Sequence, residues 1–189
     1  MSHVACRMSL RRVSRAGQSL IEAIVAISVL TTGFLGISTL LARSYFLSRV
    51  VSDQITANYL AAEGIEISKN LIDHDVYESL AGNPSFFWGR CFSYQGNPEQ
   101  VEVDYATTDC SAMAAFSGSG HLLSFDPVTH LYGYNLPLGD NPTPTNFTRE
   151  ILVSANGQQI TVDSIVRWNT GSVTLESLRL EDTFYDWQQ

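Results

Sequence analysis

The first apolar stretch of the chain is long enough to cross a membrane. Residues 20–42 read LIEAIVAISVLTTGFLGISTLLA, and Glu22 is the one charged residue in this run. At about 1.5 Å rise per residue, a helix of this length spans a hydrocarbon core of roughly 30 Å. The pattern therefore predicts a membrane-spanning helix with a single acid near its start.

Beyond this run, apolar residues recur at helical spacing among polar ones. No proline occurs before Pro84, so we expect one continuous helix from Ser19 to about Ile72, ending where Asp73-His74-Asp75 interrupts the pattern. The first half of this helix is apolar on all sides and the second half is amphipathic. The second half is therefore expected to pack on a globular head.

The C-terminal part of the chain shows the two-residue alternation of β-strands. Asp126-Pro127 and Asn156-Gly157 are turn signals between apolar runs, and the second is a strong hairpin signal. Strands are expected at 122–125, 131–134, 147–154, 159–168 and 172–180. We therefore expect an α+β fold, in which the C-terminal half of a long N-terminal helix packs against an antiparallel sheet.

The segment before the apolar run is basic. Residues 1–17 contain four arginines and no acid: Arg7, Arg11, Arg12 and Arg15. The positive-inside rule then keeps this segment in the cytoplasm and sends the C-terminal bulk outward. An ordinary secretory signal peptide is the alternative, but it has a shorter apolar region of about 7–15 residues and an A-x-A-like site after it, which is lacking here.

Gly17-Gln18-Ser19-Leu20-Ile21-Glu22, followed by an apolar helix, resembles the cleavage and methylation segment of type IV pilins and of type II secretion pseudopilins. The resemblance implies that a prepilin peptidase cuts after Gly17. It makes Gln18 the new N-terminus and a candidate for N-methylation. Glu22 becomes the fifth mature residue, which pairs in a filament with the N-terminal amine of a neighbouring subunit.

Two departures from the family pattern favour a minor subunit over the abundant shaft protein. The first mature residue is Gln18, where the family commonly has Phe, and the long helix lacks the proline of many major pilins. The series TNFTREILV, ITVDSIVRW and VTLESLRL also resembles the sheet of minor pilins of the pilus-modification kind.

Charge and cysteine content fit an extracytoplasmic head. Without residues 1–17 the chain has 7 basic and 19 acidic residues, a formal net charge of −12, which argues against a nucleic-acid-binding protein. Cys6 belongs to the leader. Cys91 and Cys110 remain, and we expect them to form a disulfide in an oxidising compartment, two buried thiols being the alternative.

Other candidate sites are weak in the sequence. Asp73-His74-Asp75 offers metal ligands, but adjacent residues rarely point at one centre, and the four aspartates Asp104, Asp109, Asp126 and Asp140 lack the spacing of a calcium loop. We expect no metal, no cofactor and no catalytic site, since no nucleophile–base arrangement is recognisable. Arg149 and Arg167 are expected to make surface or sheet-edge contacts. Phe86-Phe87-Trp88 is expected to be a core cluster, the alternative being an adhesive patch.

The resulting domain organisation has five segments. They are a cleaved cytoplasmic leader (1–17), a membrane or filament-core helix (18–42), its amphipathic continuation (43–75), a variable connecting region (76–121) and an antiparallel sheet head (122–189). We expect a minor pilin-like subunit, first in the cytoplasmic membrane and then in a pilus, whose partners are prepilin peptidase and other pilin subunits. The alternatives are a minor pseudopilin of a type II secretion system, and a membrane-anchored extracytoplasmic binding domain that never polymerises.

Overall fold

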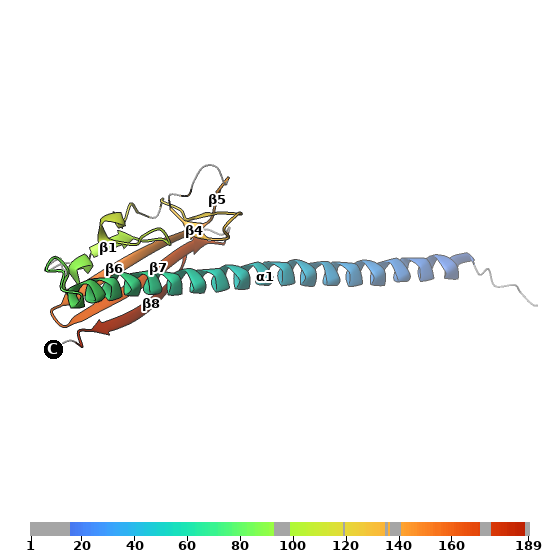
Figure 1. The fold of residues 1–189 in the computed structure, drawn as a ribbon. Helices are drawn as coiled ribbons and strands as arrows, with labels where there is room; N and C mark the ends of the chain where they lie inside the picture. The colour runs from blue at the N-terminus through green and yellow to red at the C-terminus, as the bar shows by residue number, and fades with distance from the viewer. Residues whose placement is uncertain are drawn as a thin grey trace, which may run out of the picture. The chain divides into compact units, whose positions relative to one another are not determined.

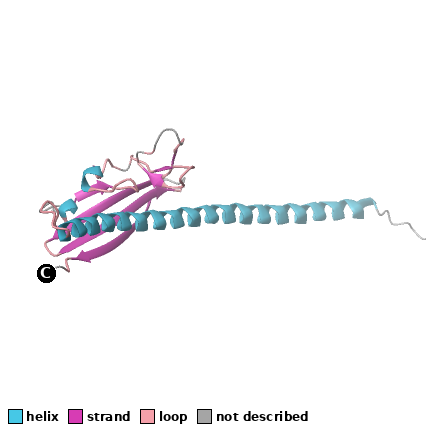
Figure 2. Ribbon diagram, viewed as in Figure 1, coloured by secondary structure: helices cyan, strands magenta, loops and turns pink. Residues whose placement is uncertain are grey.

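The computed structural model describes residues 16–92, 99–118, 120–134, 136, 141–170 and 175–187. The chain forms two compact units, Met1–Ser48 and Arg49–Gln189. Helix α1 (Ala16–Leu80) begins in the first unit and ends in the second (Figure 1). Its second half lies across one face of an antiparallel sheet (Figure 2). The fold is therefore α+β, as predicted, with the helix first in the chain and the sheet after it.

The main sheet has five antiparallel strands in the order β2-β1-β6-β7-β8. Their bounds are β1 (Glu99–Glu102), β2 (Ala114–Ala115), β6 (Phe147–Asn156), β7 (Gln159–Asn169) and β8 (Leu175–Tyr185). A second sheet has the order β4-β3-β5, formed by β3 (Ser124–Phe125), β4 (Tyr132–Gly133) and β5 (Thr143–Pro144). Two single-turn 3-10 helices precede the first two strands: η1 (Arg90–Phe92) lies between α1 and β1, and η2 (Cys110–Ala112) lies between β1 and β2.

Helix α1 extends further than the sequence pattern predicts. It continues through Asp73-His74-Asp75 to Leu80, so the expected end at Ile72 and the boundary at residue 75 are wrong. Gly82 follows the end of the helix, and its φ of 88° is in the left-handed region. The Gly82 N–H donates to the Ser79 carbonyl, and the Asn83 N–H donates to the Glu78 carbonyl. This is a Schellman cap, in which the left-handed position favours Gly because Gly has no Cβ.

Two clusters of buried apolar side chains join the helix to the sheet. Ala57, Leu60 and Ala61 pack with Phe147, Val166 and Trp168 in one cluster, and Ile65, Leu71 and Ile72 pack with Ile151, Ile160 and Val162 in the other. The helix lies so close to the sheet at Gly64 that a Cβ there would be 2.5 Å from Ser164 Oγ and 2.7 Å from Ile151 Cδ1. Small residues therefore set the distance between helix and sheet.

The predicted β-strands are largely confirmed, with changes at their ends. The hairpin around Asp126-Pro127 forms as β3 and β4, and Asn156 pairs with Gln159, so the tight turn is Gly157-Gln158, one residue later than expected. β8 continues to Tyr185 rather than ending at Leu180. β1 was not predicted: it lies in the segment assigned to a connecting region, yet it pairs with β6 inside the main sheet. The sheet head therefore does not begin at residue 122.

Candidate functional site

The apolar half of α1 is exposed in the structure. Its large side chains, from Leu20 to Leu47, each leave more than half of their surface accessible. The helix is long and apolar enough to cross a membrane, by length and composition, a property that signal sequences and core helices share. Exposed apolar surface on this scale is typical of a segment that contacts lipid or protein.

Hydroxyl groups within this segment are bonded to the helix itself. Ser28 Oγ donates to the Ile24 carbonyl, and Thr31 Oγ1 and Thr32 Oγ1 donate to the Ser28 carbonyl at 3.0 and 2.9 Å. Thr39 Oγ1 donates to the Gly36 carbonyl at 2.8 Å. Because an unpaired polar group costs several kcal/mol in hydrocarbon, these internal bonds make the segment compatible with a bilayer.

The residues of the predicted processing segment all lie in the first turns of α1. Gly17 and Gln18 follow the first helical residue, Ala16, and Glu22 lies about one turn further on with its side chain exposed. Among the described residues, no basic group lies within ion-pair distance of Glu22.

Arg149 is a buried residue, and the expectation of a surface or sheet-edge contact is wrong. Its side chain is 0% exposed on β6, facing α1. The guanidinium donates to the Leu60 carbonyl at 3.0 Å, to Glu63 Oε2 at 2.9 Å and to the Val103 carbonyl at 2.6 Å. It therefore joins helix, β6 and the end of β1 in one network. Arg167 lies on the opposite face of the sheet, with Nη1 2.6 Å from Glu150 Oε2.

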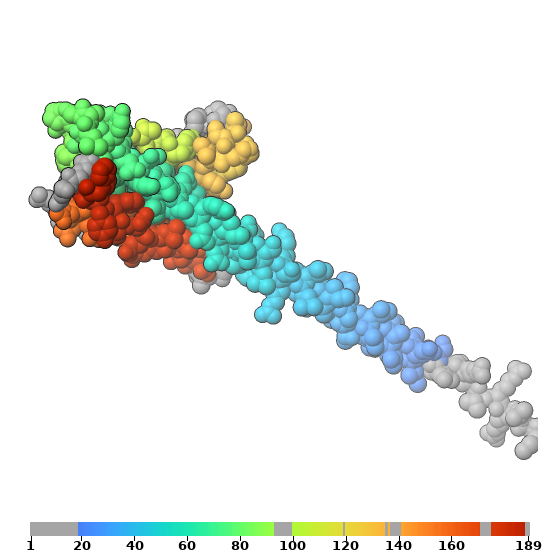
Figure 3. Space-filling model, turned by 60° about the horizontal axis from the view of Figure 1, so that its bottom comes forward, coloured from blue at the N-terminus to red at the C-terminus, as the bar shows by residue number. Residues whose placement is uncertain are grey.

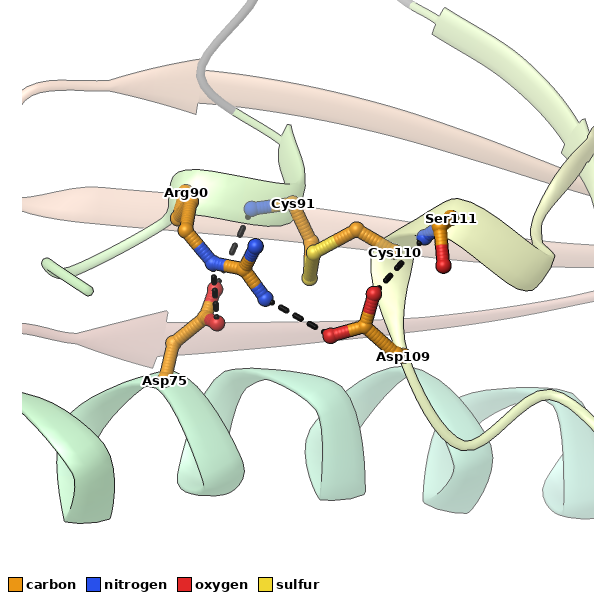
Figure 4. The surroundings of a disulfide bond; sticks show 6 residues. All are labelled: Asp75, Arg90, Cys91, Asp109, Cys110 and Ser111. Atoms are coloured by element: carbon orange, nitrogen blue, oxygen red, sulfur yellow. Dashed lines mark hydrogen bonds and ion pairs between the residues drawn. A yellow bond between two sulfur atoms is a disulfide. The ribbon is translucent and has the colours of Figure 1, made fainter. Parts of the chain in front are cut away.

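Cys91 and Cys110 are joined by a disulfide, with Cα atoms 5.0 Å apart. Figure 4 shows the charged groups around it. The Asp75 carboxylate, 0% exposed on α1, accepts from Arg90 Nε at 2.9 Å and from the Cys91 N–H at 3.1 Å. Arg90 Nη2 also donates to Asp109 Oδ2 at 2.9 Å. The disulfide and this ion-pair network fix η1 and η2 to the helix.

The electrostatics of this network favour the charged carboxylate of Asp109. Its pKa is lowered to about 2, first because the Ser111 N–H donates to it and second because the Arg90 guanidinium does. Asp109 lies before η2 as its N-cap. The Asp109 carboxylate therefore both caps η2 and pairs with Arg90.

The predicted metal-ligand candidates do not converge. In the Asp73-His74-Asp75 segment, Asp73 and His74 are exposed while Asp75 is buried. Asp104 accepts from the Tyr134 N–H, and Asp126 from Val128 and Thr129, in separate turns. Asp140 lies outside the described residues. Asp75 with both cysteines is the one group of possible ligands among the described residues, and its sulfur atoms are bonded to each other.

Glu102, His121 and Tyr134 form a second polar cluster, which the sequence pattern does not predict. Glu102, 4% exposed, accepts from the Ser117 N–H at 2.9 Å and lies 2.7 Å from His121 Nδ1. The His121 ring stacks on Tyr134, whose hydroxyl bonds both the N–H and the carbonyl of Arg149. Burial raises the pKa of Tyr134 to about 12. Glu102 lies on β1, which the sequence pattern did not reveal.

The aromatic residues Phe86-Phe87-Trp88 are divided between core and surface. Trp88 packs against the larger apolar cluster, as a core residue was expected to do. Phe86 stacks edge-on with His74 and lies 4.1 Å from the Arg90 guanidinium, whereas Phe87 is 51% exposed. The prediction of a core cluster is therefore wrong for Phe87.

Comparisons with protein-family models, with curated proteins and with solved structures found no match for this chain.

Proposed function

We propose that this chain is a minor pilin-like structural subunit without catalytic activity. Prepilin peptidase cuts it after Gly17, and its N-terminal helix then carries it into a type IV pilus. The observation behind the proposal is Glu22, an exposed carboxylate in the first turns of an exposed apolar helix, five residues after Gly17. A plain membrane anchor has no use for an acid there, because a charge in hydrocarbon is unfavourable, costing about 2.5–3.5 kcal/mol at mid-bilayer and less near a helix end.

A partner in the filament gives Glu22 its function. After cleavage, Gln18 carries a positively charged amine, methylated or not, and the amine of a neighbouring subunit neutralises Glu22. Breaking a buried ion pair by removing one partner costs about 3–5 kcal/mol. This penalty falls on any subunit out of register, so the pair selects the correct position along the filament.

The architecture of the chain supports the same proposal. An α+β fold in which one helix contributes an exposed apolar half and a half covered by a sheet suits a subunit that is first stored in a membrane. The head then lies outside the cytoplasm, where the disulfide between Cys91 and Cys110 is stable. The head tunes assembly, adhesion or retraction of the pilus.

A minor pseudopilin of a type II secretion system is the second candidate, since the same processing segment supports it. Deletion of the gene separates the two: loss of piliation with normal secretion supports the pilus, and loss of secretion alone supports the pseudopilus. A third possibility, an anchored binding domain that never polymerises, predicts that the leader stays attached.

The role of Glu22 is tested by Glu22→Ala, with Glu66→Ala on the exposed face of the same helix as the matched control. Both variants should reach the membrane in normal amounts. Glu22→Ala should be largely absent from sheared filaments, while Glu66→Ala should be incorporated like the wild type. Equal incorporation of Glu22→Ala would contradict the proposed registry role.

A further inference from the structure

Strand β8 is a long and regular edge of the main sheet, with no further strand paired to it among the described residues. The other edge, β2, has two residues, whereas β8 pairs with β7 over eleven residues without a break in register. Figure 3 shows β8, in red, at the margin of the second unit. Natural sheets protect their edges with short strands, prolines, bulges, lysines or other charges. Of these devices β8 has charged side chains alone.

One hydrogen bond shows which residues of β8 turn their backbone N–H and C=O groups toward the open side. The Asp186 N–H donates to the Gln158 carbonyl at 2.8 Å, so the alternation of an antiparallel pair turns the even-numbered residues of β8 toward β7 and the odd-numbered ones outward. Thr183 fits this pattern, because its N–H donates to Asp182 Oδ1 rather than to β7. Within the described residues, no acceptor contacts the outward N–H groups of Ser177, Arg179 or Glu181.

The side chains of β8 determine which types of residue a strand added at this edge should have. On the face toward α1, Leu178, Leu180 and Phe184 pack against the apolar clusters. On the other face, Arg179 is bound by both oxygens of Asp163 at 2.8 Å. Charged residues along the strand are three acids and one arginine, a net charge of −2: Glu176, Arg179, Glu181 and Asp182.

From this geometry we infer that the outer edge of β8 is a docking site for an extended, net-basic segment of another polypeptide, which adds as an antiparallel sixth strand. Main-chain hydrogen bonds to Ser177, Arg179 and Glu181 hold the segment, while the Thr183 N–H stays bonded to Asp182 Oδ1. Its specificity comes from basic residues opposite Glu181 and Asp182, an acid opposite Arg179, and apolar residues opposite Leu180 and Phe184.

The direction of the helix argues for another polypeptide rather than a second copy. Leu60 clusters with Trp168, and Ile72, further along α1, clusters with Ile160. Because β7 and β8 are antiparallel, α1 and β8 run in the same direction. Two copies joined antiparallel at β8 would run residues 49–80 of their helices in opposite directions. Subunits held in one membrane by their N-terminal segments would instead share one orientation. The exclusion of a second copy rests on the membrane anchoring proposed above. The open edge of β8 does not depend on that anchoring.

The inference is tested with a fluorescent peptide of complementary sequence, Thr-Val-Thr-Lys-Lys-Val-Glu-Val-Thr-Lys-Val, added to the full chain in detergent micelles. In the antiparallel register its central Val lies opposite Leu180. Fluorescence anisotropy should show saturable binding. A control peptide with every charge reversed should bind about tenfold more weakly, since four cross-strand charge pairs become repulsive.

Ser177→Pro is the matched backbone variant, because the exposed Ser177 N–H points outward and its loss spares the β7 ladder. It should keep the unfolding temperature of the wild type and bind the peptide about tenfold more weakly, whereas Ser177→Thr should bind normally. Equal binding of both peptides, no binding of either, or normal binding by Ser177→Pro would each overturn the inference. Sedimentation showing a dimer that Ser177→Pro dissociates would also overturn it, in favour of a second copy.

Discussion

The Arg149 guanidinium donates to Glu63 Oε2 at 2.9 Å, linking β6 to α1 through a side chain with no exposed surface. Glu63 remains 30% exposed, so the pair lies at the boundary between core and solvent. Arg149 also bonds two main-chain carbonyls, of Leu60 and Val103. The pair therefore fixes the position of the helix on the sheet.

Replacing Glu63 by Gln should destabilise the head. Breaking a fully buried pair costs about 3–5 kcal/mol, and the partial exposure of Glu63 reduces the expected cost to roughly 1–3 kcal/mol. Glu66→Gln, at an exposed position three residues away, should change little. Urea unfolding followed by tryptophan fluorescence measures both. Equal midpoints for the two variants would show that the pair adds nothing to stability.

Gly64→Ala should also destabilise the head, despite the higher helix propensity of alanine. The new Cβ would lie 2.5 Å from Ser164 Oγ and 2.7 Å from Ile151 Cδ1, so helix and sheet would have to separate. Overpacking of this kind costs about 1–3 kcal/mol, against a propensity gain of about 1 kcal/mol. Gly120→Ala has open space around its Cβ and is the control. A higher unfolding temperature for Gly64→Ala would contradict the close approach.

Loss of the disulfide should lower the free energy of unfolding by about 3 kcal/mol, because Cys91 and Cys110 are 19 residues apart and the loop they close restricts the unfolded chain. The variant with both cysteines replaced by serine should unfold at lower urea concentration. The wild type in excess reductant should approach that midpoint. An unchanged midpoint in both cases would mean that Asp75 and Arg90 hold the loop without the covalent bond.

The free energy of unfolding should fall in acid, because the Asp109 carboxylate becomes protonated there. Its folded-state pKa of about 2 is below the ordinary 3.8, so its contribution is present above pH 4 and is lost as pH falls toward 2. The effect should be modest, since its side chain is 39% exposed. Urea midpoints of wild type and Asp109→Asn, measured from pH 6 to pH 2, should converge as the pH falls. A constant difference between them would contradict this linkage.

The sequence predicts the parts of this fold that depend on local periodicity. The helix over residues 19–72 and the β6–β7 hairpin follow from apolar spacing and from Asn156-Gly157. The extension of α1 to Leu80 was missed because Asp73-His74-Asp75 resembles a helix end. In the structure, the buried Asp75 is held by Arg90, fifteen residues away, a contact that local pattern does not encode.

Long-range pairing explains the other errors. β1 is four residues long in a polar region, and its place beside β6 depends on a pairing about fifty residues away. An arginine in a strand is ordinarily expected at the surface, yet Arg149 is buried because Glu63 and two carbonyls satisfy it. Conversely, Gly17, Gln18 and Glu22 belong to one short local motif, so the amino-acid sequence alone is enough to recognise that candidate site.

Cleavage after Gly17 is the most direct test of the central proposal. The full chain is expressed with and without a prepilin peptidase, and the membrane-extracted protein is analysed by intact-mass spectrometry. The account predicts that the peptidase removes residues 1–17 and leaves Gln18 as the N-terminus, and that a charge-preserving variant, Gly17→Leu, stays uncut. An intact leader on the wild-type chain in the presence of active peptidase would contradict it.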